Sequence, residues 1–321
     1  MEENDSAYPF LPLAPPSGRT AARWVVLFAA DPPVSRKTRT QLDRLRYGAG
    51  AFTPLLSLVS PMPSSPETVL VTGASSGIGR KLAHRFARAG SHCVLLARSE
   101  DALHTLADSL ASDYDVSTDV VVADLGGPDA ADDVVAELEA RGLSVDVLVN
   151  NAGFGARGAF AELDADRQVD MIRVNVTALT HLARLLLPGM LERDRGGVLN
   201  VASTAGFQPG PRMTVYYATK AYVLSFSEGL HEEMAGAGVT VSCLAPGPTR
   251  TSFVDRAGMN DATLFDLGTT MSAGDVAQAG YDGFRRGRAV VVPGWPNKIG
   301  AFMIRFTPRP VARKVAGWLN A

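Results

Sequence analysis

The sequence has little cysteine, a nearly balanced charge and no long apolar run. Cys93 and Cys243 are the only cysteines among 321 residues, and each lies in an apolar run typical of a strand. Buried thiols in a reducing compartment are therefore favoured over a disulfide. The formal net charge of −2 predicts no strong affinity for nucleic acid or for an anionic membrane. No apolar run reaches the ~20 residues that a membrane-spanning helix needs.

The sequence also shows no motif typical of a metal site or of a secretory signal. The five histidines show no metal-ligand spacing with cysteines or carboxylates, so we expect no metal. The chain begins with Glu2, Glu3 and Asp5, which is the wrong charge for a secretory signal. Together with an ordinary globular composition, these absences predict a cytoplasmic protein.

The first 61 residues differ from the rest of the chain. Ten of the 20 prolines fall within the first 66 residues, and the apolar patches Trp24–Ala30 and Ala51–Val59 are too short to found a domain. We interpret residues 1–61 as an extension that is disordered, loosely docked or foreign to the native protein. Met62 precedes the first predicted strand, and residues 62–321 are expected to form a single domain.

From residue 68 onward, strand patterns alternate with helical ones. Long helices are predicted over residues 164–193 and 214–234. The strands are short continuous runs of valine and leucine, as expected where both faces of a parallel sheet are buried. They are predicted at 68–71, 93–96, 120–123, 145–149, 198–201, 239–244 and 289–292. This alternation predicts an α/β fold with one doubly wound parallel sheet, a Rossmann fold with helices on both faces.

A glycine-rich turn lies between the first strand and the first helix. Gly73, Gly77 and Gly79 punctuate the segment Thr72–Arg80, and an amphipathic helix follows. A turn of this kind exposes backbone N–H groups at a helix N-terminus and lets a pyrophosphate approach closely. The spacing G-x-x-x-G-x-G also fits a turn that needs positive φ at one or two glycines.

Polar residues follow the next three strands. Arg98 stands about 20 residues beyond the glycines, where an acidic residue would select NAD and an arginine suits the 2′-phosphate of NADP. We therefore predict NADP(H) rather than NAD(H). Asp124 can bond the adenine amine or cap the next helix, and both readings stay open. Asn150 and Asn151 end the fourth strand in a turn that can link neighbouring strand ends.

Tyr216, Lys220 and Ser203 form the decisive constellation. Tyr216 and Lys220 are four residues apart on a predicted helix, so they share a face. A cation beside a phenol favours the phenolate and should lower the phenol's pKa, which suits acid–base chemistry on an alcohol or carbonyl oxygen. Ser203 follows the strand 198–201 and can donate a hydrogen bond to the reacting oxygen. Tyr217 would point about 100° away around the helix.

In this order, the motifs resemble those of the short-chain dehydrogenase/reductase family over about residues 67–295. By this resemblance Tyr216 is the catalytic acid/base, Ser203 orients the substrate carbonyl and Lys220 holds the nicotinamide ribose. Asn175, within the long helix, resembles the fourth catalytic residue and supports a proton relay; it can also be a polar residue bonded to backbone. The resemblance rests on the segments Thr72–Gly79, Asn150–Gly153 and Pro246–Thr249 together with these four residues.

The resemblance also implies a set of cofactor contacts. The expected residues are Gly73, Ser75, Ser76, Gly77, Ile78, Gly79, Arg98, Asp124, Leu125, Asn151, Ala152, Gly153, Tyr216, Lys220, Pro246, Gly247 and Thr249. The implied partners are a small carbonyl or alcohol substrate and further copies of the chain in a homodimer or homotetramer. The departures from the pattern, the N-terminal extension and Ala202 beside Ser203, leave the chemistry intact.

Two segments bear on what is bound. Residues 251–271 carry several apolar side chains and two glycines, which is typical of a mobile apolar lid over a hydrophobic substrate, or of an ordinary packed loop. Residues 298–319 form a basic amphipathic segment that Pro308 and Pro310 divide into two short helices. Such a segment covers a core or a partner subunit more often than a membrane, but membrane contact stays open.

The sequence therefore supports two hypotheses. The first is an NADP(H)-dependent oxidoreductase that interconverts a hydrophobic ketone and a secondary alcohol. The alternative is an NADP-binding regulatory or scaffold protein that keeps the fold without turnover. The intact set of Asn175, Ser203, Tyr216 and Lys220 favours the enzyme.

Overall fold

The computed structural model describes residues 66–259, 262–265 and 270–321, which all belong to the unit Pro61–Ala321. The predicted N-terminal extension lies outside the described residues, as do parts of the segment 251–271.

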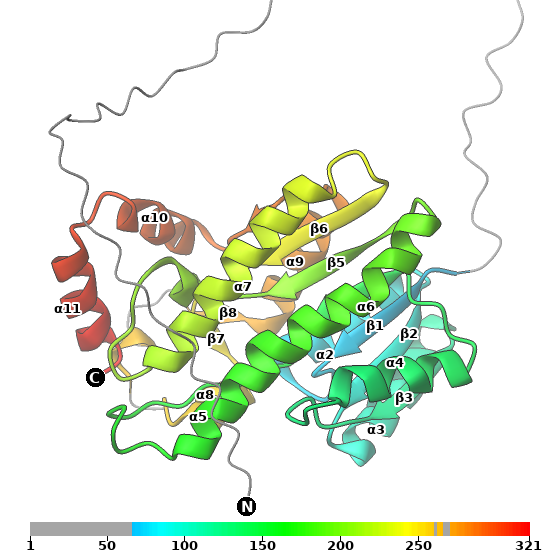
Figure 1. The fold of residues 1–321 in the computed structure, drawn as a ribbon, viewed down its shortest axis with the longest axis horizontal. Helices are drawn as coiled ribbons and strands as arrows, with labels where there is room; N and C mark the ends of the chain where they lie inside the picture. The colour runs from blue at the N-terminus through cyan, green and yellow to red at the C-terminus, as the bar shows by residue number, and fades with distance from the viewer. Residues whose placement is uncertain (1–65, 260–261, 266–269) are drawn as a thin grey trace, which may run out of the picture. The chain divides into compact units, whose positions relative to one another are not determined.

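Seven parallel strands form the central sheet (Figure 1). Their order is β3-β2-β1-β4-β5-β6-β9, so the order reverses between β1 and β4, where open α/β sheets bind their ligands. The strands are β1 (Thr68–Thr72), β2 (His92–Ala97), β3 (Thr118–Val122), β4 (Val147–Asn150), β5 (Gly196–Val201), β6 (Val239–Leu244) and β9 (Val290–Val291). The predicted doubly wound Rossmann fold is confirmed, and each predicted strand is present.

Helices cover both faces of the sheet because alternate strand residues point to opposite sides. Val69 and Val71 pack in one buried cluster with α2, α3 and α9, whereas Leu70 packs in another with α4 and α6. The helices are α2 (Gly77–Arg88), α3 (Glu100–Tyr114), α4 (Ala130–Ala140), α5 (Ala165–Ile172), α6 (Leu179–Glu192), α7 (Thr214–Glu233), α8 (Ser252–Ala257), α9 (Ala273–Arg285), α10 (Trp295–Ile304) and α11 (Arg309–Leu319).

A π-helical turn, η2 (Arg173–Ala178), joins α5 to α6 and makes one long helix of the predicted stretch 164–193. Among the described residues, only the helix Ala165–Glu192 is long and apolar enough, by length and composition, to cross a membrane. A helix that covers a buried sheet passes the same test, and this one packs against α4 and β5. Leu182 and Met190 of this helix are fully buried, whereas Ile172 is 44% exposed.

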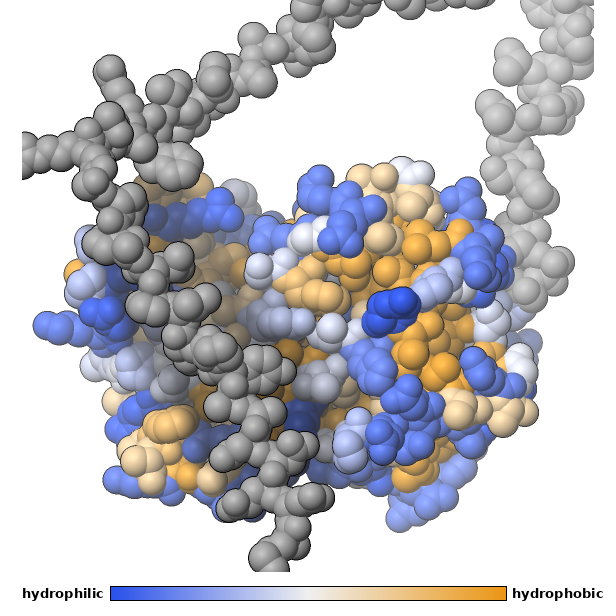
Figure 2. Space-filling view, in the orientation of Figure 1, coloured by the Kyte–Doolittle hydropathy of each residue, from blue (hydrophilic) through white to orange (hydrophobic). Residues whose placement is uncertain are grey.

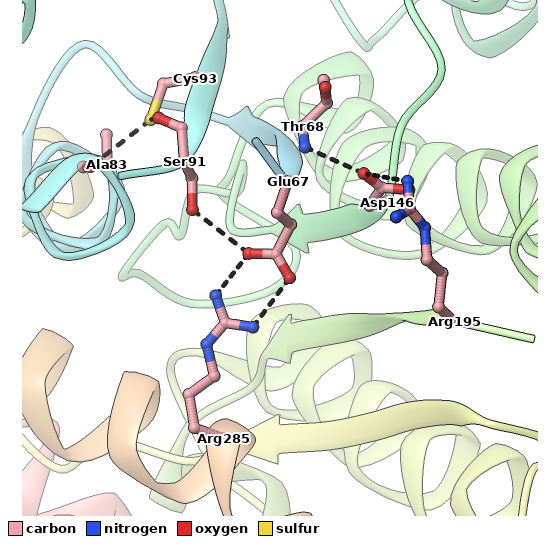
Figure 3. Close-up of polar contacts among 8 residues, drawn as sticks. All are labelled: Glu67, Thr68, Ala83, Ser91, Cys93, Asp146, Arg195 and Arg285. Atoms are coloured by element: carbon pink, nitrogen blue, oxygen red, sulfur yellow. Dashed lines mark hydrogen bonds and ion pairs between the residues drawn. The ribbon is translucent and has the colours of Figure 1, made fainter. Parts of the chain in front are cut away.

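The edge of the sheet opposite the ligand crevice is closed by ion pairs (Figure 3). Arg285 of α9 donates to both oxygens of Glu67, which precedes β1. Asp146, before β4, accepts from the backbone N–H of Thr68 at 3.1 Å and pairs with Arg195 at 3.2 Å. Cys93 lies nearby as a buried free thiol, as does Cys243 in β6. These contacts hold the strand starts in register, so the opposite strand ends keep fixed positions.

Two further short strands, β7 (Thr249–Arg250) and β8 (Met271–Ser272), pair outside the main sheet and were not predicted. They are too short to give a period of their own. They join the two ends of the segment 251–271, whose described part contains α8 and a 3₁₀ turn at Thr263–Phe265. The face drawn in Figure 2 mixes apolar and hydrophilic side chains.

Candidate active site

The glycine-rich turn interlocks with the Asn150–Gly153 turn at the switch point between β1 and β4. Gly73 has φ +65°, and a Cβ there would lie 2.9 Å from both the Cα of Ala152 and the Nδ2 of Asn151. A Cβ on Gly79 would lie 2.3 Å from the same amide nitrogen. Asn151 Nδ2 donates to the backbone oxygen of Thr72 at 2.9 Å. The two glycines are therefore required by this packing, whereas Gly77, with φ +57°, shapes the turn itself.

The N-terminus of α2 is open to the cavity that runs along the strand ends. Its N-cap, Ser76, makes no side-chain cap bond, and its first turn contains no acidic residue. Its first N–H groups therefore remain available for an anion. Arg256 of α8 also reaches this point, because its Nη2 lies 3.5 Å from the hydroxyl of Ser76. No sequence motif predicts a role for Arg256 here, because a tertiary contact between residues 180 positions apart brings it to this point.

Arg98 and Asp124 meet at the far end of the same cavity. Arg98 Nη1 lies 3.4 Å from Asp124 Oδ2, and both side chains are exposed. The other carboxylate oxygen of Asp124 accepts from the N–H of Gly126 at 3.0 Å, so Asp124 closes its own turn and caps no helix in the structure. Leu125 is buried and lines the cavity beside them. A cation thus stands where the sequence predicts a 2′-phosphate site.

Arg98→Ala should change coenzyme preference. A charge-assisted hydrogen bond is worth roughly 1.5–3 kcal/mol, so we expect the KM for NADPH to rise about 10- to 100-fold and that for NADH to change less than about threefold. Steady-state kinetics with both coenzymes measures this. Arg80→Ala, on the first turns of α2 but outside the cavity lining, is a matched control that should change neither value. An equal loss with both coenzymes for Arg98→Ala would contradict the assignment.

Ser203, Tyr216 and Lys220 line the middle of the cavity. The Lys220 ammonium lies 5.8 Å from the centre of the Tyr216 ring and donates to the backbone oxygen of Val201 at 2.8 Å. Ser203 accepts from the N–H of Ala205 at 3.1 Å, which fixes its hydroxyl at the end of β5. A hydrogen bond connects this hydroxyl to the Tyr216 phenol. The structure therefore places the tyrosine predicted to act as acid/base and its neighbour Ser203 in the lining of one cavity.

The pKa of Tyr216 is shifted opposite to the sequence-based expectation. Burial raises the pKa of the phenol, and the hydrogen bond with Ser203 only partly lowers it. The expected lowering by Lys220 is wrong for this structure because desolvation disfavours the phenolate and the ammonium is directed at Val201. Burial also lowers the pKa of Lys220 to about 8. A protonated phenol suits a group that donates a proton to a carbonyl oxygen.

Asn175 is buried within the π-helical turn, and its side-chain amide forms hydrogen bonds with Phe154 and Thr219. Its Oδ1 accepts from the N–H of Phe154 at 3.1 Å. Its Nδ2 donates to the oxygen of Phe154 at 3.0 Å and to the hydroxyl of Thr219 at 3.1 Å. The side chain therefore ties the loop after β4 to α7, next to Lys220. π-turns of this type are frequent at functional sites.

Apolar side chains line the other end of the cavity. Phe253 of α8 stacks obliquely on the Tyr216 ring, with centroids 5.3 Å apart. The apolar end is completed by Met213, Met259, Leu264 and Leu319. A Cβ on Gly155 would lie 2.9 Å from the Phe253 ring, so this glycine leaves room for α8. Leu319, almost the last residue, was not predicted here because only tertiary packing carries the C-terminus to the site.

Most predicted cofactor and catalytic residues line this one cavity. The exceptions are Gly79 and Asn175, which pack directly behind it. Ser75, Ile78, Ala152, Gly153, Pro246, Gly247 and Thr249 all face the cavity, as do the residues described above. Among the residues that the structure describes, no group of three histidine, cysteine or acidic side chains is placed to hold a metal.

Comparisons with known proteins agree with this geometry. Residues 67–261 match the family model described as short chain dehydrogenase. The very-long-chain 3-oxoacyl-CoA reductase of Anas platyrhynchos is 41% identical over 229 residues, which cover 70% of this chain and 71% of that protein. The bovine and human proteins of that name are matched over 58% and 60% of their lengths.

Solved structures give the same picture. A short-chain dehydrogenase from Sphingobium yanoikuyae in complex with NADPH is 36% identical, with a TM-score of 0.66, and covers 75% of this chain and 95% of its own. The bulky-bulky ketone specific alcohol dehydrogenase from Comamonas testosteroni is 33% identical, with a TM-score of 0.64, and covers 75% of this chain and 92% of its own.

These relatives overturn the predicted cytoplasmic location. The three relatives named as very-long-chain 3-oxoacyl-CoA reductases act on a substrate whose acyl tail favours lipid by ~0.8 kcal/mol per buried CH₂. The prediction depended on the acidic residues near the start of the sequence and on the expected absence of a membrane-spanning run, and neither excludes attachment to a membrane surface. The cytoplasmic assignment is therefore wrong.

Proposed function

The chain belongs to the short-chain dehydrogenases, NADP(H)-dependent oxidoreductases that act on C=O and CH–OH groups, and from this premise we propose that it reduces a bulky, mainly apolar ketone to a secondary alcohol. The observation that carries this proposal is the Tyr216 phenol, buried between Ser203 and the apolar end of one cavity. The names of the relatives add two substrate classes, 3-oxoacyl thioesters and bulky-bulky ketones.

The residues of the cavity fit NADP(H). The open N-terminus of α2 suits the pyrophosphate and Arg98 suits the 2′-phosphate. Lys220 and the segment Pro246–Thr249 line the part of the cavity nearest to Tyr216, where the nicotinamide ribose would be held. When bound, the cofactor supplies the hydride that reduces the carbonyl carbon.

The protein supplies the proton and the orientation. The phenol of Tyr216 donates its proton to the carbonyl oxygen, and the hydroxyl of Ser203 hydrogen-bonds the same oxygen. Burial keeps Tyr216 protonated until this transfer, because the phenolate is disfavoured in the desolvated cavity. Asn175 holds the Phe154 loop against α7. The loop and the helix form two walls of the cavity, and these hydrogen bonds keep the separation between them fixed.

The apolar end of the cavity supports a large substrate. Phe253 and Leu264 come from the segment 251–271, and Leu319 comes from α11. Apolar walls with a few convergent polar groups are typical of small-molecule sites. We further propose that residues 62–321 contain the whole catalytic unit, because the family match begins at residue 67 and the predicted site residues fall between Gly73 and Thr249.

NADPH consumption against a carbonyl panel tests the proposal. The panel contains 3-oxoacyl thioesters of increasing chain length, diaryl ketones and small ketones such as acetone. We expect turnover to increase with the apolar bulk on the carbonyl. Binding of NADPH without oxidation by any member would favour the silent scaffold, and preference for acetone would contradict the apolar substrate.

A further inference from the structure

The two C-terminal helices carry large apolar side chains on the outside of the protein. Figure 1 shows α10 and α11 at one edge of the fold, beyond α7 and at the opposite end from β3. Trp295, Phe302 and Phe306 are 76%, 58% and 68% exposed. The exposed set, named here the C-terminal apolar face, is Trp295, Ile299, Phe302, Met303, Phe306, Val311, Val315 and Trp318.

The orientation of α11 is the reverse of an ordinary amphipathic surface helix. Its small residues Ala312 and Ala316 are buried, whereas Val311, Val315 and Trp318 face outward. The outward residues recur at i, i+4 and i+7, so they form one stripe. On α10 the residues Trp295, Ile299 and Phe302 follow the same spacing, and Phe306 follows two residues after the helix ends. Because this helix buries alanine and exposes tryptophan, most of its apolar surface is turned away from the protein. An exposed apolar surface of this kind marks a site of interaction with another molecule or a membrane.

The helices are held firmly, so this exposure is a property of the folded state. Asn320, which is fully buried, accepts from the Tyr217 hydroxyl at 3.1 Å and donates to the backbone oxygen of Pro211 at 3.0 Å. At the start of α10, Asn297 is buried and donates to the oxygen of Pro293 at 3.0 Å. Polar anchors at both ends of the pair fix the direction of the apolar face.

The charge of the segment is strongly one-sided. Residues 283–321 contain eight arginines and lysines and no aspartate or glutamate, in a chain whose formal net charge is −2. Five of the cations accompany the apolar face, namely Lys298, Arg305, Arg309, Arg313 and Lys314, and all are exposed. Lys298 lies over the Trp295 ring at 5.7 Å, as cations and indoles do where water meets an apolar phase.

We propose that the C-terminal apolar face docks on the surface of an anionic lipid bilayer. The outward tryptophan and phenylalanine side chains enter the headgroup–acyl boundary, and the surrounding cations meet the lipid phosphates. A second copy of this chain fits the face less well, because a two-fold interface would bring like cations together. The face thus lies on the bilayer without crossing it.

The docked orientation bears on the substrate, and this step rests on the proposed function. Leu319 lines the apolar end of the catalytic cavity, while its neighbour Trp318 belongs to the C-terminal apolar face. Docking through α11 would therefore bring that end of the cavity close to the lipid. A long-chain ketone could then enter from the bilayer without crossing water.

Vesicle co-sedimentation of the full chain tests the docking. The probes are vesicles of phosphatidylcholine alone and of phosphatidylcholine with 30% phosphatidylglycerol, at roughly 0.1 M salt, where charge attraction still acts over about 10 Å. We expect binding to the anionic vesicles and much weaker binding to the neutral ones. The triple variant Phe302→Ser/Phe306→Ser/Trp318→Ser should lower the partition coefficient at least about tenfold, since each large apolar side chain contributes more than one power of ten.

Matched variants make the result specific. Phe160→Ser/Ile172→Ser removes exposed apolar side chains elsewhere and should bind vesicles like the wild type. Lys298→Gln/Arg305→Gln should weaken binding only to the anionic vesicles, by roughly tenfold. Removal of residues 1–61 should leave vesicle binding unchanged. NADPH binding and thermal unfolding show that each variant is folded.

Three outcomes would overturn the proposal. One is no binding to either vesicle at low salt, and another is binding that the triple variant retains. The third is a dimer that the triple variant converts to a monomer, together with no vesicle binding, which would identify a second copy as the partner. None of these readouts uses turnover, so failure of the proposed function leaves them interpretable.

Discussion

Tyr216→Phe should lower kcat by about 10³-fold and leave the dissociation constant of NADPH within about twofold. The variant keeps the ring that stacks on Phe253 and loses only the hydroxyl that hydrogen-bonds Ser203. General acid catalysis contributes typically 10²- to 10⁴-fold, and water is a poor substitute in a cavity where the phenol is buried. Stopped-flow hydride transfer and NADPH fluorescence titration measure the two quantities.

The adjacent tyrosine gives a matched control. Tyr217 lies on the same helix, but its hydroxyl donates to Asn320 and not to Ser203. Tyr217→Phe should therefore keep kcat within about threefold and cost roughly 1 kcal/mol of unfolding free energy, because one buried hydrogen bond is lost. If Tyr217→Phe abolished turnover and Tyr216→Phe did not, the acid would be assigned to the wrong tyrosine.

Lys220→Met should separate function from stability. Burial lowers the pKa of Lys220 to about 8, so its charge costs stability at neutral pH. Methionine fills a similar volume without that charge, although the hydrogen bond to Val201 is lost. We expect the variant to be more stable than the wild type at pH 7 by on the order of 1 kcal/mol. We expect kcat/KM to fall at least about 100-fold, because the charge-assisted hydrogen bonds with which Lys220 would hold the nicotinamide ribose are lost.

The pH dependence of this difference has a definite sign. In the unfolded chain Lys220 keeps its proton up to its ordinary pKa of 10.5, whereas in the folded chain it releases the proton above about 8. Between these values the unfolded state binds more protons, so the wild type gains stability as the pH rises. From pH 7 to pH 9.5 the wild type should gain up to about 2 kcal/mol relative to Lys220→Met, so the advantage of the variant should disappear or reverse. Urea unfolding at both pH values tests it; an advantage that grows with pH would contradict the buried charge.

Local patterns in the sequence predicted the elements and a doubly wound parallel sheet. Continuous valine and leucine runs marked the buried strands, and the 3.6-residue period marked the helices at 164–193 and 214–234, which the structure confirms. The glycine positions were predictable because a backbone at φ +65° or +57° tolerates few other residues. The strands β7 and β8 were not predicted, because a strand of two residues is too short to show an alternation of apolar and polar side chains.

The site was predictable where residues of one segment act together. Tyr216 and Lys220 share a helix face at any tertiary arrangement, and strand ends must meet at one edge of a parallel sheet. The sequence did not predict three features of the site, because each depends on segments that are far apart in the chain. These features are the positions of Arg256 and Leu319 and the Tyr217–Asn320 hydrogen bond. The roles of the site residues stay predictions until the variants are measured.

The sequence by itself determined the fold and predicted the residues of the cofactor cavity and the proton donor, because periodicity, glycine geometry and helical spacing are local properties of the chain. Only the tertiary structure decided the sense of the Tyr216 pKa shift, the partners of Asn175 and the outward direction of the C-terminal apolar face. Each of these depends on which atoms surround a group and exclude water from it. That environment is assembled from distant segments, so no local pattern contains it.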